Sequence, residues 1–132
     1  MQTGDGYPDS NIAFHFNPRY EGDPVVVMNT WLDSAWGSEE RHDCGPLKPG
    51  ENFALIIRVK SDGYKVIVNG HKFFKFEHRV SPKISNSIEI TGDITVHRLL
   101  INSLLCITLR SLAKPDYVIA IYNILEKDKK LE

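Results

Sequence analysis

The chain has 132 residues, of which 42% are hydrophobic and 25% are charged, as in an ordinary soluble globular domain. This length suits one domain with a proper core. The formal net charge of −1 gives no electrostatic reason to expect nucleic acid or an anionic membrane as a partner.

Cysteine and histidine usage argues against a disulfide framework and against a metal site. Cys44 and Cys106 are an isolated pair, so we expect free thiols. The five histidines show no paired ligand spacing, so we expect no metal and no cofactor. No signal segment and no apolar run of about 20 residues occurs. These features predict a cytoplasmic protein, or one exported by a route that needs no signal peptide.

The first predicted strand covers residues 12–19 and follows a loop of turn-forming residues, 1–11. Polar and apolar residues alternate along it. A strand sends alternate side chains to opposite faces, so one face goes to the core and the other presents donors and acceptors. The residues on that second face are His15, Asn17 and Arg19.

Further strands follow at short intervals, with no convincing helix between them. A turn at residues 22–24 leads to an apolar run that contains Asn29. Asn69-Gly70, flanked by alternating apolar residues, predicts a hairpin, because both turn positions need positive φ. This spacing predicts an all-β, antiparallel two-sheet sandwich. The later predicted strands are residues 53–59, 64–68, 71–77, 87–91 and 94–101.

Seven side chains of the first third can converge on one concave patch if their strands are neighbours in one sheet. Together they offer a flat aromatic ring, a carboxylate, two guanidinium groups, two amides and an imidazole. Such a patch suits a small, neutral, hydroxyl-rich ligand. The set is His15, Asn17, Arg19, Asn29, Trp36, Glu39 and Arg41.

An enzyme is the weakest interpretation, and we assign no catalytic residues. Glu39 and Glu40 are adjacent on a strand and point to opposite faces, so they cannot flank one glycosidic bond. No nucleophile–base pair occurs. Residues 77–79 are interpreted as a solvated strand end.

The strings H-F-N-P-R, V-M-N and W-G-S-E-E-R, in this order and spacing, resemble the carbohydrate-recognition domain of galectins. The resemblance covers about residues 10–101. It implies a galectin-like jelly roll that binds β-galactosides, of lactose or N-acetyllactosamine type, on its concave sheet without metal. The implied partners are such glycans on glycoproteins or glycolipids, with no nucleic acid, no membrane insertion and a homodimer left open.

The resemblance also implies a role for each of the seven side chains. Residues matching His15, Asn17 and Arg19 hydrogen-bond the axial 4-hydroxyl of galactose in the family. Those matching Asn29 and Glu39 hold the 6-hydroxyl. Trp36 matches the ring that stacks on galactose, and Arg41 joins Arg19 and Glu39 in a charged cluster that reaches the next sugar.

The two ends depart from the family, so we expect a partial carbohydrate-recognition domain over residues 1–103 and a divergent C-terminal tail over residues 104–132. The resemblance implies family strands before residue 12, including one beside the sugar-binding strand; we expect this chain to lack them and therefore to have an open sheet edge. Residues 113–116 should turn, and the apolar residues 117–125 should dock there. The runner-up is that residues 117–125 drive self-association. The alternative function is a galectin-like structural or interaction protein with impaired sugar binding.

Overall fold

The computed structural model describes residues 11–85, 87–99, 106–111 and 116–123, the last two ranges as backbone strands. The described residues form strands and one three-residue 3₁₀ helix, Pro82–Ile84, which follows the hairpin around Asn69-Gly70. None of them forms a helix with the length and apolar character needed to cross a membrane. The strands are β1 (Asn11–Arg19), β2 (Val25–Leu32), β3 (Ala35–Trp36), β4 (Glu40–His42), β5 (Phe53–Val59), β6 (Gly63–Val68), β7 (His71–Glu77), β8 (Ser87–Asp93), β9 (Cys106–Ser111) and β10 (Asp116–Asn123).

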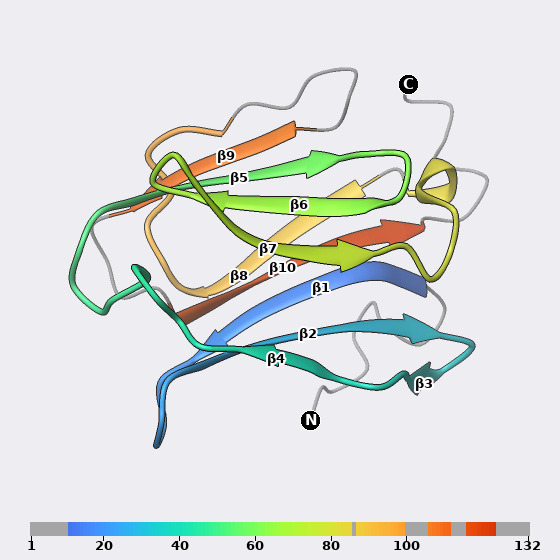
Figure 1. Ribbon diagram of the computed structural model, residues 1–132, viewed down its shortest axis with the longest axis horizontal. Helices are drawn as coiled ribbons and strands as arrows, with labels where there is room; N and C mark the ends of the chain where they lie inside the picture. Colours follow the sequence, from blue (N-terminus) through green and yellow to red (C-terminus); the bar gives the residue numbers. More distant parts are fainter. Residues whose placement is uncertain (1–10, 86, 100–105, 112–115, 124–132) are drawn as a thin grey trace.

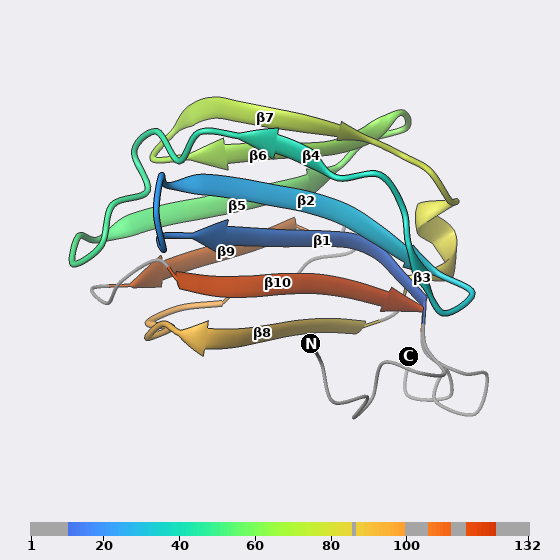
Figure 2. The ribbon, with the colours of Figure 1, turned by 90° about the horizontal axis from the view of Figure 1, so that it is seen from below.

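Two antiparallel sheets lie face to face (Figure 1), which confirms the predicted sandwich. One sheet has the order β3-β2-β1-β10-β8, and β4 also pairs with β2. The other has the order β7-β6-β5-β9. Figure 2 views the molecule from below, with β4, β2, β1, β10 and β8 toward the reader.

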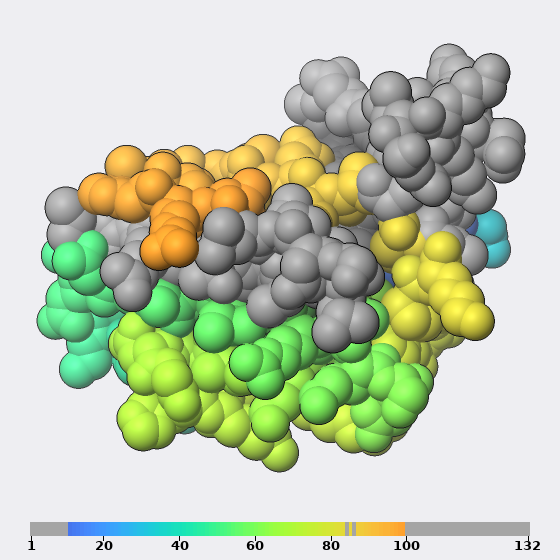
Figure 3. Space-filling model, turned by 90° about the horizontal axis from the view of Figure 1, so that it is seen from above, coloured from blue at the N-terminus to red at the C-terminus, as the bar shows by residue number. Residues whose placement is uncertain are grey.

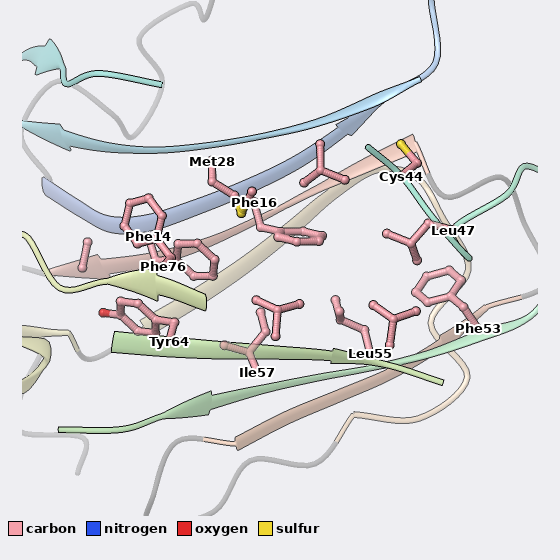
Figure 4. Packing of buried hydrophobic residues seen from close by; sticks show 14 residues of the cluster. Phe14, Phe16, Met28, Cys44, Leu47, Phe53, Leu55, Ile57, Tyr64 and Phe76 are labelled. Atoms are coloured by element: carbon pink, nitrogen blue, oxygen red, sulfur yellow. The ribbon is translucent and has the colours of Figure 1, made fainter. Parts of the chain in front are cut away.

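The core lies between the sheets and is built from the inward side chains of both (Figure 4). Phe14 of β1 stacks on Tyr64 of β6 with ring centroids 4.7 Å apart, and it meets Phe76 of β7 at 4.8 Å. All three rings are buried. Because each aromatic ring removes a large apolar area from water, this cluster fixes how the two sheets face each other.

The alternation predicted for β1 is confirmed from Phe14 onward, since Phe14, Phe16 and Pro18 are buried. The alternate residues, His15, Asn17 and Arg19, are half-buried or exposed. Before that point the strand has an irregular register against β2, between Ile12 and His15. Ile12, Ala13 and Phe14 are buried in succession. A bulge of this kind adds a residue to one strand, and it sets which face receives His15.

The hairpin at Asn69-Gly70 is confirmed, since the two residues have φ of 53° and 84° and join β6 to β7. The strand predicted over residues 94–101 is wrong for residues 94–99, which belong to no strand. Gly92 has φ of 113°, and the Ile94 N–H donates to the Gly92 carbonyl at 3.0 Å. This local turn ends β8, and the exposed residues 95–99 have no buried face to form a further strand.

The C-terminal part of the chain contributes a strand to each sheet. β9 pairs with β5, and β10 lies between β1 and β8. The edge of β1 that was predicted to be open is therefore occupied by β10, as the docking prediction requires. Residues 124 and 125 of the predicted docking segment, the turn residues 113–115 and residues 1–10 of the leading loop lie outside the described residues.

Candidate functional site

The face of the six-stranded sheet that points away from the core carries most of the seven predicted site residues. We call it the polar face. Strand pairing places His15 opposite Asn29, and Asn17 opposite Val27, which in turn lies opposite Arg41 on β4. Paired residues of neighbouring strands share a face. β1, β2 and β4 thus bring their polar side chains together, as the sequence predicted.

His15 and Trp36 form the apolar end of the polar face. Their rings meet edge to face with centroids 4.9 Å apart, and Trp36 also meets Trp31 edge to face at 5.1 Å. Trp36 nonetheless keeps 45% of its surface exposed. An exposed aromatic ring held by two neighbours is a rigid platform on which an apolar ligand surface can stack.

His15 is neutral at physiological pH. Burial, followed by repulsion from Arg19, lowers the pKa of His15 from 6.5 to about 4. A neutral imidazole has one N–H donor and one acceptor nitrogen, so it can both donate to and accept from hydroxyl groups.

The low pKa of His15 predicts a pH-dependent stability. Between pH 6.5 and 4 the unfolded chain binds a proton at this residue and the folded chain does not, so the free energy of unfolding falls as the pH falls. We expect His15 to account for a loss of about 2–3 kcal/mol between pH 7 and 4.5. Urea unfolding of the wild type and His15→Gln at both pH values measures it. An equal pH dependence in the two proteins contradicts the assignment.

Two polar pairs form the other end of the polar face. The Arg19 Nε donates to Asn17 Oδ1 at 2.9 Å. The Arg41 Nε and Nη2 donate to Glu39 Oε1 at 3.0 and 2.9 Å. The charged cluster expected from Arg19, Glu39 and Arg41 thus appears as an Arg41–Glu39 ion pair with Arg19 held by an amide. Charge-assisted bonds of this kind fix the donor directions before a ligand arrives.

Arg19 and Arg41 both line a depression of about 620 Å³. It lies beside the ends of β1 and β2, next to the turn between them. Its size falls within the range of small-ligand sites. The lining residues are Asn17, Arg19, Tyr20, Glu21, Asp23, Val25 and Arg41.

Asn29 is buried, and its amide already has protein partners. Its Nδ2 donates to the Gly37 carbonyl at 2.9 Å, and its Oδ1 accepts from the Thr30 N–H at 2.7 Å. Nδ2 carries a second hydrogen, so one donor is left for a ligand. The assignment of Asn29 to a ligand hydroxyl stays a prediction, and its observed contacts tie β2 to the segment after Trp36.

Arg79 is exposed and lies just after the end of β7, in agreement with its interpretation as part of a solvated strand end, but its hydrogen bonds were not predicted. Its Nη1 donates to Asn29 Oδ1 at 3.0 Å, and its Nη2 donates to the Ser38 carbonyl and to Glu40 Oε2 at 2.8 and 2.9 Å. The guanidinium also lies 4.7 Å from the centre of the Phe76 ring. Arg79 therefore connects β7 to the segment between Trp36 and Glu40. Since 50 positions separate Arg79 from Asn29, no local pattern could reveal it.

The two glutamates have separate partners, but Glu39 lies outside β4, so the predicted alternation along one strand is not what separates them. Glu39 binds Arg41 on the polar face, whereas Glu40 binds Arg79. Cys44 is a buried free thiol, as predicted, and burial raises its pKa so that it stays protonated. The side chain of Cys106 lies outside the described residues.

The two-sheet sandwich has one outer face that combines polar side chains with an exposed tryptophan, a surface that suits a hydroxyl-rich ligand. The family model described as galactoside-binding lectin matches residues 1–101, more than half of the chain. The chain therefore belongs to the galactoside-binding lectins, the galectin family, and residues 1–101 contain its carbohydrate-recognition domain. Lectins bind sugars without transforming them, which agrees with the prediction that the chain is not an enzyme.

Similar proteins come from mammals and a nematode. Human galectin-4 is 40% identical over 92 residues, which cover 70% of this chain and 28% of galectin-4. Dog galectin-3 is 43% identical over 89 residues, which cover 64% of this chain and 30% of galectin-3. The 32 kDa beta-galactoside-binding lectin of Caenorhabditis elegans is 36% identical over 86 residues. These cover 65% of this chain and 30% of the nematode lectin. The chain thus spans less than a third of the length of these relatives.

Proposed function

We propose that this chain is a lectin for β-galactosides of the lactose and N-acetyllactosamine type, which it binds on the polar, concave face without a metal ion. The observation that carries the proposal is the exposed Trp36 ring held against neutral His15. Galactose has one face rich in C–H groups, and covering that face with an indole ring stabilises the complex. Its natural partners would be such glycans on glycoproteins or glycolipids.

The hydroxyl groups of galactose match the donors and acceptors beside Trp36. His15, Asn17 and Arg19 are assigned to the axial 4-hydroxyl, and Asn29 and Glu39 to the 6-hydroxyl. Arg41 would hold Glu39 and reach the second sugar. A sugar with an equatorial 4-hydroxyl would cover His15, Asn17 and Arg19 without pairing them, which accounts for a strong preference.

Lactose is expected to bind with a dissociation constant on the order of 0.1 mM, because desolvation of the hydroxyl groups offsets most of each hydrogen bond. Calorimetric titration measures the constant, and cellobiose is the matched control because its terminal sugar differs from that of lactose only at C4. Excess EDTA should change nothing. A folded protein that gives no heat with several millimolar lactose would reject the proposal and favour the structural or interaction role.

Arg19→Ala and Glu39→Ala are each expected to weaken lactose binding by more than about 1.5 kcal/mol, roughly tenfold or more, since each change leaves a polar partner unpaired. The free energy of unfolding should change little, because Arg19 is exposed and the ion pair of Glu39 lies at the surface. Calorimetry and urea unfolding measure the two quantities. Arg98→Ala and Glu77→Ala remove exposed charges elsewhere and should bind like the wild type. Near wild-type affinity in either site variant contradicts the role of the charged cluster.

A further inference from the structure

The outer face of the four-stranded sheet, on the far side of the core from the polar face, carries a row of positive charges. Arg58 of β5 lies opposite Lys65 of β6, and Lys65 lies opposite Lys75 of β7. Neighbouring strands are about 4.8 Å apart, so the backbones that carry successive cations of the row are spaced by roughly that distance. We call these three residues, together with Lys60 and Lys72, the basic stripe.

The basic stripe includes a shallow depression of about 360 Å³. Four of its lining residues are lysines and one is an acid, Asp62, which binds the Lys75 ammonium. Because Asp62 is the one acid in the lining, the other three lysines have no acidic partner among the lining residues. The lining residues are Lys60, Ser61, Asp62, Lys65, Lys72 and Lys75.

The charge of the stripe contrasts with that of the whole chain. Between residues 58 and 77, up to the end of β7, there are five Lys or Arg and two acids, whereas the complete chain has a net charge of −1. The positive charge is therefore concentrated in β5, β6, β7 and their connections. Figure 3 views this outer face from above, with β5, β6 and β7 in green to lime.

The fold alone does not account for the row. Like charges directly opposite on neighbouring strands destabilise a sheet. Lysines on an edge strand such as β7 do keep it from pairing with another sheet. Arg58 and Lys65, however, lie on the interior strands β5 and β6, where no such edge exists. A bound anion would remove the repulsion along the row.

We propose that the basic stripe binds a linear sulfated polysaccharide. Sulfate groups repeated along an extended chain match cations repeated across the strands, and the depression accommodates one sugar unit with its hydroxyls near Ser61. Membrane and single-stranded nucleic-acid surfaces ordinarily use exposed apolar or aromatic side chains. Among the described residues, the exposed large hydrophobic side chains are Trp36, Val96 and Leu99, none of which belongs to the stripe.

The inference is independent of the lactose site, because the two sheets and the core separate the faces. A sulfated polysaccharide and a β-galactoside would occupy the protein at the same time. The chain would then connect a galactose-bearing glycan on one side to a polyanion on the other.

A size-defined, fully sulfated heparin hexasaccharide tests the proposal by calorimetry in 50 and 200 mM NaCl. We expect binding at 50 mM NaCl that weakens tenfold or more at 200 mM, because association releases counterions. The de-sulfated hexasaccharide should not bind. Saturating lactose should leave the hexasaccharide affinity within twofold.

The matched variants remove two positive charges each. Lys65→Gln/Lys72→Gln lies in the stripe, and Lys48→Gln/Lys83→Gln removes two exposed lysines outside it. We expect a loss of tenfold or more in hexasaccharide affinity for the stripe variant and less than twofold for the control. The control should unfold at an unchanged temperature, and the stripe variant at an equal or higher one, because it removes Lys65 from between Arg58 and Lys75. An equal loss in both variants, displacement by lactose, or absence of binding at 50 mM NaCl overturns the proposal. Tighter binding to phosphatidylserine vesicles or to single-stranded DNA at equal charge concentration overturns the choice of a polysaccharide.

Discussion

Removal of residues 104–132 is expected to leave the chain unfolded or insoluble. This deletion takes away β9 and β10, so β5 and β1 each lose one neighbour and β8 loses its described strand partner. Each buried backbone group left unpaired costs about 1–3 kcal/mol, and the total stability of a domain is only about 5–15 kcal/mol. Soluble yield and thermal unfolding of the shortened chain measure the effect. A shortened chain that is more soluble and binds lactose unchanged would contradict docking and support self-association.

A single substitution tests the same strand in the full-length chain. Ala120 lies between His15 of β1 and Glu89 of β8, in the interior of the sheet. Proline lacks the N–H that an interior strand uses, so Ala120→Pro should lower the free energy of unfolding by at least about 2 kcal/mol. Val96→Pro is the control, since Val96 is exposed and belongs to no strand. Urea unfolding compares them, and an equal, small loss in both variants contradicts the interior position of β10.

The sequence predicted those parts of the structure that depend on local patterns. The alternation in β1 identified the polar side chains, and Asn69-Gly70 located a hairpin through its need for positive φ. The strand pairings that place Asn17, Val27 and Arg41 in one row were predicted only as a condition, because pairing order is not written in any one strand. The expected convergence followed once the order of the strands was known.

The features that could not be predicted from the sequence depend on contacts between distant residues or on burial. The apolar character of residues 117–125 predicted a need for a partner surface, but the position of β10 between β1 and β8 depends on two other strands. Residues 94–99 have strand-like composition, and a local turn at Gly92 directs them elsewhere. The low pKa of His15 could not be predicted, because it results mainly from burial, and alternation alone does not determine how deeply a side chain is buried.

Arg79 is the most informative of these omissions, because it reaches the polar face from the segment that follows β7 of the other sheet. It holds Asn29, the Ser38 carbonyl and Glu40 with one guanidinium group. These contacts fix both ends of the segment that follows Trp36 and contains Glu39. Arg79 is therefore a positioning residue, whose effect on sugar binding should exceed its effect on stability.

Arg79→Ala is expected to weaken lactose binding tenfold or more and to lower the free energy of unfolding by less than about 1 kcal/mol, since two of the three Arg79 bonds are exposed. Arg79→Lys keeps the charge but cannot span three acceptors, so its affinity should be intermediate. Gly37→Ala provides an independent approach, because a Cβ there would lie 3.0 Å from Arg79 Nη1 and 3.2 Å from Asn29 Oδ1. Calorimetry with lactose, beside the exposed control Arg98→Ala, measures all four variants. If Arg79→Ala and Gly37→Ala reduce stability but bind lactose as well as the wild type, Arg79 has a purely structural role.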